Sequence, residues 1–167
     1  MLSNNASGVA ERIDAALDEL SGVDLTAVSV TELLRLAERC ERLLRRQRVV
    51  CGDIAVQLGR RDVADLGGRP HKVLADWLRI SPAEARRRAT VAEPLAGRTT
   101  LTGEPLPPRQ PATAQAWREG ELDVEHVRVI ARFLAELPIA VPREDRDGAE
   151  AFLAEHARSL RPDQLAR

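Results

Sequence analysis

Apolar side chains recur at steps of three and four residues along most of the chain, and no segment alternates as a strand would. This spacing predicts a first helix over about residues 8–20. A longer second helix begins at the capping box Ser29-x-x-Glu32 and is expected to reach about residue 64. The remaining helical segments are 70–79, 82–92, 111–119, 124–136, 142–159 and a further start at 161–163. The predicted fold class is all-α, a multi-helix bundle with one long central helix.

The long helix carries an apolar seam from Leu33 to Leu58 at alternating steps of three and four, which is typical of a coiled coil. We expect this seam to face the core, and it could also be wider than one chain can cover. A homodimer through the long helix is therefore one candidate arrangement. The seam comprises Leu33, Leu36, Ala37, Cys40, Leu43, Leu44, Gln47, Val50, Cys51, Ile54 and Leu58.

A stripe of arginines follows the seam by two residues: Arg35, Arg39, Arg42 and Arg46. Two residues correspond to about 200° of helical rotation, so the stripe is expected to face away from the core. One interpretation is a ridge that contacts phosphates. The favoured interpretation is a solvated face, because the spacings Glu38–Arg42 and Glu41–Arg45 are stabilising i,i+4 pairs.

The segments 70–79 and 82–92 resemble a helix-turn-helix, joined by Ile80 and by Ser81 as the N-cap of the second helix. Alanines at 85, 89 and 92 are expected to pack inward and to leave the arginines outward. In a helix-turn-helix the start of the second helix enters the DNA major groove. Ordinary helical packing is the favoured alternative, since the turn has no glycine. The candidate DNA contacts in this helix are Arg86, Arg87 and Arg88.

Residues 97–111 are rich in proline and glycine and form the expected loop between two helical parts. The predicted organisation is an N-terminal helix and linker over 1–28, followed by the long helix and the helix-turn-helix-like pair over 29–96. The loop then leads to a C-terminal helical part over 112–167, which stops one turn into a helix and is expected to be truncated.

Composition narrows the class of protein. The 167 residues are 44% hydrophobic and only 2% aromatic, so the core must be aliphatic. No apolar run is long enough for a membrane span, and the first residues do not form a secretory signal. The net charge of −1 conceals a basic middle: residues 35–109 carry +7, whereas 1–34 carry −5 and 110–167 carry −3. A basic middle is what a phosphate backbone would contact.

The usual catalytic and metal-binding patterns are missing from the sequence. Cys40 and Cys51 are too far apart along one helix for a disulfide and are expected to be buried, reduced thiols of a cytoplasmic protein. Trp77 and Trp117 are expected to anchor the core. His156 is expected in the core, and a neutral hydrogen-bonding role is predicted for His126 at the start of its helix. No cofactor, metal site or small-molecule substrate is indicated.

Two segments are more specific than these patterns: LADWLRISPAEARRRATVAEPL and GEPLPPRQPATAQAWREGELDVEHVRVIARFLAELP. They resemble the actinobacterial domain of unknown function 222, the 13E12 repeat family, over about residues 30–167. Members often carry a C-terminal HNH nuclease domain, and many are linked to repeated or mobile DNA. The resemblance therefore implies the N-terminal helical part of an HNH-endonuclease-like protein.

The nuclease motif of the longer members is absent from this sequence. An HNH site needs a histidine base and His, Asp or Asn metal ligands in a compact ββα unit, whereas His71, His126 and His156 lie on three predicted helices. We expect no enzymatic activity from this chain. The predicted function is a non-catalytic module that binds duplex DNA, and Arg86 and Arg87 are expected to contribute more than Arg35 or Arg39. The alternative is a helical dimerisation or protein-interaction scaffold without a nucleic-acid role.

Overall fold

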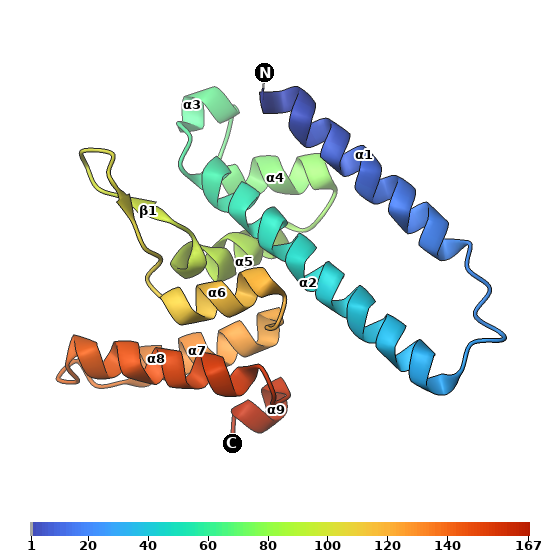
Figure 1. Ribbon diagram of the computed structural model, residues 1–167. Coiled ribbons are helices and arrows are strands. Elements are labelled where there is room, and N and C mark those ends of the chain that lie inside the picture. Colours follow the sequence, from blue (N-terminus) through green and yellow to red (C-terminus); the bar gives the residue numbers. More distant parts are fainter. Residues whose placement is uncertain (1) are drawn as a thin grey trace. The chain divides into compact units, whose positions relative to one another are not determined.

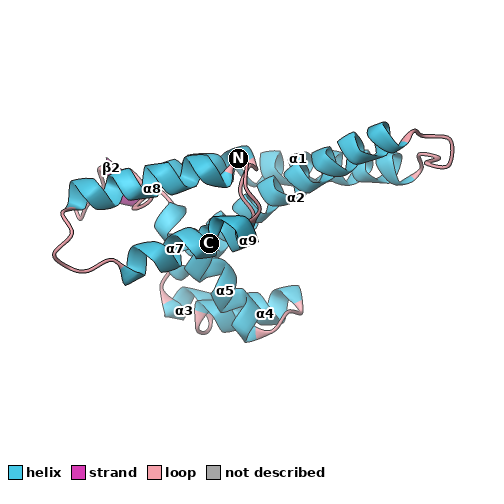
Figure 2. Ribbon diagram, turned by 90° about the horizontal axis from the view of Figure 1, so that it is seen from below, coloured by secondary structure: helices cyan, strands magenta, loops and turns pink. Residues whose placement is uncertain are grey.

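The computed structural model describes residues 2–167 and confirms the all-α fold (Figures 1 and 2). The longest helix is α2. It begins at the predicted capping box, where the Ser29 Oγ accepts the Glu32 N–H at 3.3 Å. The helices are α1 (Leu2–Ser21), α2 (Val30–Gly59), α3 (Val63–Leu66), α4 (Pro70–Leu78), α5 (Pro82–Ala92), α6 (Pro111–Glu119), α7 (Val124–Glu136), α8 (Arg143–Ala157) and α9 (Pro162–Leu165).

The chain forms two compact units, residues 1–39 and 40–167, and the boundary lies inside α2. In the first unit, α1 begins at Leu2, earlier than predicted, because its first turn has no apolar spacing that would reveal it. The second unit holds the remainder of α2 and all later elements.

The main core of the second unit lies among α6, α7 and α8 and is aliphatic apart from Trp117, which is 3% exposed. Val49 of α2, Leu95 in the 3-10 turn Glu93–Leu95 and Leu122 in the α6–α7 turn complete this cluster. A smaller cluster joins Ala55 of α2 to Leu74 of α4 and Ala85 of α5.

The turn between α4 and α5 confirms the capped helix start. Arg79 ends α4 in the left-handed conformation, with φ 54°, and Ser81 accepts the Glu84 N–H at 3.1 Å. Ala85 and Ala92 are buried and Ala89 is partly buried, as the inward face of α5 was predicted to be. The conformation that glycine usually supplies in such turns is here adopted by an arginine.

A short β-hairpin corrects the prediction of a loop without strands over 97–111. β1 (Arg98–Thr99) and β2 (Pro105–Leu106) pair antiparallel, with Arg98 opposite Leu106. Strands of two residues are too short to produce a readable alternation. The long helix also ends earlier than predicted, at Gly59, because Asp62 caps the separate helix α3 by accepting the Ala64 N–H.

The packed face of α2 differs from the predicted seam. Its buried residues are Val49, Gly52, Ala55 and Val56, whereas the seam residues Leu43, Leu44, Val50, Cys51 and Ile54 are exposed. Small residues decide which face packs, because a Cβ at position 52 would lie only 2.8 Å from the Cβ of Ala92. The larger aliphatic side chains of the predicted seam therefore lie outside the packed face of α2. Cys51 is consequently exposed rather than buried, and Cys40 is half-buried.

Trp77 is a further correction, since it is 85% exposed rather than a core anchor. The buried face of α4 is formed by Leu74 and Ala75. Around α4, position 77 lies about 60° from Leu74 and about 160° from Ala75, on the side of Leu74 that is turned away from Ala75.

Candidate nucleic-acid interface

The outer face of α5 forms one side of a groove of about 790 Å³, which we name the α5–α7 groove. The α5 residues that line it lie on one helical face, because Ala83, Arg86 and Arg87 follow Pro82 by one, four and five positions. The first turn of α4 contributes His71, and α7 contributes Arg128. The lining consists of His71, Pro82, Ala83, Arg86, Arg87, Thr90, Val91, Pro94, Val127, Arg128 and Ala131.

The titratable side chains that line the α5–α7 groove are all basic: three arginines and one histidine, with no carboxylate among the described lining residues. Arg86 points its Nη2 at the Nε2 of His71, 3.4 Å away. Neither Arg86 nor Arg128 forms an ion pair within residues 2–167. Two guanidinium groups from different helices are therefore available to an anion in the groove.

The three arginines predicted on α5 do not share one environment. Arg87 and Arg88 both pair with Glu84, Arg88 at 2.9 Å, whereas Arg86 is exposed beside His71. Arg87 and Arg128 also line a neighbouring groove of about 550 Å³. That groove includes the carboxylates of Glu84, Asp123 and Glu125, so its charge is mixed.

The predicted arginine stripe of α2 is exposed, but two of its residues contact a neighbouring turn of the chain. Arg42 pairs with Glu121, and the side chain of Arg46 packs against Gly120, where an added Cβ would lie 2.9 Å from the Arg46 Cγ. Both residues are exposed, as the prediction expects, but the α6–α7 turn packs on their side of the helix. Arg35 and Arg39 are exposed.

Two arginines outside that stripe complete the contact of α2 with the α6–α7 turn. Arg45 donates to the carbonyl of Glu121 at 2.8 Å, and Arg48 pairs with Asp123. Gly120 makes this turn possible, since its φ is +77° and its α-carbon lies directly against the backbone of Arg42.

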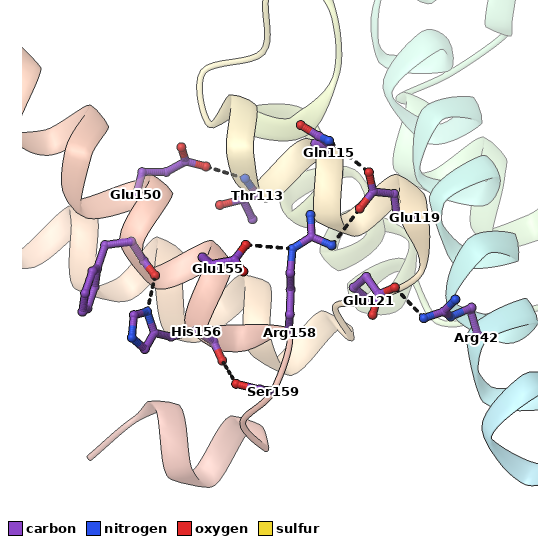
Figure 3. A network of polar contacts seen from close by, with 11 residues as sticks. Arg42, Thr113, Gln115, Glu119, Glu121, Glu150, Glu155, His156, Arg158 and Ser159 are labelled. Carbon is purple, nitrogen blue, oxygen red and sulfur yellow. Dashed lines mark hydrogen bonds and ion pairs between the residues drawn. The ribbon is translucent and has the colours of Figure 1, made fainter. Parts of the chain in front are cut away.

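Polar contacts that the sequence did not reveal join α6 to α8 (Figure 3). Glu150 of α8 is 3% exposed and accepts the N–H groups of Ala112 and Thr113, the latter at 2.6 Å. It thereby caps α6, whose own N-cap Gln110 makes no side-chain cap bond. No sequence spacing links a carboxylate on one helix to the start of another, so this cap had no local signal.

Arg158 forms the second part of the network in Figure 3 by bridging Glu119 at 2.8 Å and Glu155 at 3.2 Å. A hydrogen bond from Gln115 and the contact with Arg158 lower the pKa of Glu119. The hydrogen bond to Glu119 raises the pKa of Arg158.

The two other histidines have structural positions away from the α5–α7 groove. His126 is 4% exposed, accepts the Asp123 N–H on Nδ1, and donates from Nε2 to the Leu160 carbonyl at 2.8 Å. This pair of bonds requires the neutral ring and confirms the predicted hydrogen-bonding role. His156 is exposed and stacks on Phe152, so its predicted burial was wrong. The buried face of α8 is formed instead by Glu150, Ala154 and Ala157.

Sequence reasoning missed His71 and Arg128 as parts of the groove. Both are ordinary helical surface positions in the sequence, and only the packing of α7 beside α5 brings them together. Among the described residues, no group of His, Cys, Asp or Glu side chains is arranged to hold a metal ion. Nor does the described part of the chain contain a helix that is long and apolar enough to cross a membrane.

Comparison with known proteins gives a family without an assigned activity. A family model described as a domain of unknown function, DUF222, matches residues 34–167. The uncharacterized Mycobacterium tuberculosis protein Rv1128c is 41% identical over 153 residues, which cover 91% of this chain and 34% of that protein. The uncharacterized Mycobacterium tuberculosis protein Rv1148c is 45% identical over an alignment of 167 residues, gaps included, that covers 95% of this chain and 37% of that protein. The chain thus spans about a third of the length of these relatives. No solved structure matches.

Proposed function

The chain belongs to the DUF222 family, and we propose that it is a non-catalytic helical module that binds duplex DNA through the α5–α7 groove. We further propose that the module serves a longer, HNH-endonuclease-like protein associated with mobile DNA. This second step is supported by the family resemblance and by relatives about three times as long as the chain. Catalysis is assigned to parts of such a protein outside this module.

The observation that carries the proposal is the basic lining of the α5–α7 groove. Arg86 comes from α5 and Arg128 from α7, so their guanidinium groups reach the groove from two helices. Arginine binds phosphate oxygens through charge-assisted, often bidentate hydrogen bonds. The capped start of α5 adds the positive end of its helix dipole, since Pro82 and Ala83 also line the groove. Cationic side chains on two sides of a groove are suited to contact the phosphates of the DNA backbone rather than the edges of bases.

The test compares two double variants with wild type by fluorescence anisotropy on a labelled duplex at several salt concentrations. Arg86→Ala/Arg128→Ala is expected to weaken binding at least about tenfold and to reduce the salt slope by about 2, because two phosphate contacts are removed. Arg35→Ala/Arg39→Ala, with the same charge change at exposed positions, is the matched control and is expected to change binding less.

A wild-type chain that shows no salt-sensitive duplex binding would rule the DNA function out. If Arg35→Ala/Arg39→Ala weakened binding more than Arg86→Ala/Arg128→Ala did, the binding surface would lie on α2 and not in the α5–α7 groove. Plasmid incubated with Mg²⁺ and the pure chain is expected to stay intact, and cleavage that EDTA abolishes would contradict the non-catalytic assignment.

The second candidate is a helical scaffold that dimerises through α2. The observation in its favour is the aliphatic stripe of Leu43, Leu44, Val50 and Ile54, each at least 43% exposed. Light scattering distinguishes the two candidates, because a scaffold gives a dimer mass that Leu43→Glu/Ile54→Glu reduces to the monomer. The DNA-binding module needs no such dimer.

A further inference from the structure

His71 lies in the first turn of α4, with its ring in the α5–α7 groove and its Nε2 3.4 Å from the Nη2 of Arg86. A guanidinium group can only donate, so Nε2 must accept and carry no proton when this contact is made. A helix N-terminus also disfavours the protonated ring. In the unliganded groove, His71 is therefore a neutral hydrogen-bond acceptor.

The charged groups around His71 have the same effect. Desolvation, followed by the charges of Arg86, Arg69 and Lys72, holds the pKa of His71 below its ordinary value. From α7, Arg128 lines the same groove. Neither Asp62, the N-cap of α3, nor Asp65 within α3 is among the described residues that line it, and Glu84 of α5 pairs with Arg87 and Arg88. A cluster of cations with no carboxylate in its lining leaves room for negative charge from a ligand.

A phosphodiester in this groove would favour the protonated form of His71 instead of the neutral form. Its charge would attract Arg86 away from Nε2 and give a protonated His71 an anionic acceptor. The pKa of His71 is low without the ligand and rises when the anion binds. At a pH between the pKa of the free groove and the pKa of the complex, binding takes up a proton. Affinity therefore increases as the pH falls through that range.

We propose that His71 is a phosphate-binding residue of the α5–α7 groove, that it contacts a backbone oxygen of duplex DNA as an imidazolium, and that binding takes up a proton. This proposal rests on the DNA-binding function proposed above. It adds a binding residue and fixes the chemistry recognised as the phosphodiester backbone.

The test is the pH dependence of duplex affinity at constant ionic strength, between about pH 5.5 and about pH 8. Wild type is expected to bind about tenfold more tightly at the lower pH, the effect of a shift of about one pKa unit. H71Q is expected to lose most of this gain, and H71R to bind tightly at both pH values. The matched control is H156Q, which alters an exposed histidine on α8 and is expected to keep the wild-type dependence.

Calorimetry in two buffers of different ionisation enthalpy measures the proton directly. We expect uptake at about pH 6.5 by wild type and H156Q, and none by H71Q or H71R. Duplex binding that retains its full pH dependence in H71Q would overturn the role of His71 while leaving the proposed DNA function intact. Absence of salt-sensitive duplex binding in wild type would overturn both. Equal His71-dependent binding of inorganic phosphate, without added affinity for duplex, would replace the DNA backbone by a free anion and overturn the proposal.

Discussion

Two sets of arginines in the second unit have different surroundings although they are the same residue type. Arg42, Arg45 and Arg48 of α2 are engaged by the α6–α7 turn, through two carboxylates and a backbone carbonyl. Arg86 and Arg128 line the α5–α7 groove and form no ion pair within the described residues. The first set holds helices together, whereas the second has no ion-pair partner among the described residues.

The difference shows that a run of basic residues does not by itself identify a nucleic-acid surface. What distinguishes the sets is the position of the acidic residues: Glu121 and Asp123 lie beside α2, but no carboxylate lines the α5–α7 groove among described residues. In a paired arginine the charge is balanced by the carboxylate and part of the donor set is already occupied. Substitutions in the two regions should therefore affect different properties, stability in one and binding in the other.

The largest expected effect is at Gly120, where the α6–α7 turn meets α2. Gly120→Ala should lower the free energy of unfolding by about 3 kcal/mol, since a Cβ adds left-handed strain and steric overlap. That Cβ would lie 2.9 Å from the Arg42 carbonyl oxygen. Urea unfolding monitored by circular dichroism measures the change.

Gly103→Ala is the matched control for this prediction. Gly103 has φ +89° but no atom within 4 Å of an added Cβ, so only the backbone strain is imposed. We expect a loss of about 1 kcal/mol. If Gly120→Ala cost no more than Gly103→Ala, the close contact between α2 and the α6–α7 turn would be disproved.

The next effect separates the two arginine sets directly. Arg42→Ala/Arg48→Ala removes two partly exposed ion pairs and the packing of their alkyl chains, and should cost about 1–2 kcal/mol of stability. Arg86→Ala/Arg128→Ala removes the same number of charges but no ion pair, and should change stability by less than about 0.5 kcal/mol. Unfolding curves recorded side by side test both. Equal losses in the two variants would show that the division into paired and available arginines is wrong.

Local signals allowed much of the fold to be predicted. Proline and Ser81 mark the start of α5, and α6 and α7 have the predicted ends. Such signals act within a few residues, where capping and helical spacing operate. The hairpin and the early end of α2 were missed because their signals span only two to four residues each.

The candidate site was predicted only in part for the same reason. The sequence indicated that Arg86 would be exposed, and the i,i+3 and i,i+4 spacing of Glu84 to Arg87 and Arg88 was a local signal that the prediction did not use. His71 and Arg128 are brought to Arg86 by tertiary packing alone. The face of α2 was misread because Gly52 and Ala55 gave no hydrophobic signal, although their small size decides where α2 packs.

The smallest expected effect concerns Arg79, in the turn between α4 and α5, and has the opposite sign to that of the α2 arginines. Arg79 adopts φ 54° and ψ 42°, a conformation that costs a residue with a Cβ about 1 kcal/mol relative to glycine. Arg79→Gly should therefore raise the free energy of unfolding only slightly, by up to about 0.5 kcal/mol after the added freedom of the unfolded chain is subtracted. Arg79→Ala is the control, because it removes the charge but keeps the Cβ and should bring no gain. Arg79 does not line the α5–α7 groove, so duplex affinity should stay unchanged in both variants. An equal gain in Arg79→Ala would assign the effect to the side chain rather than to the backbone, and a loss in Arg79→Gly would show that this arginine, like those of α2, contributes to the stability of the fold.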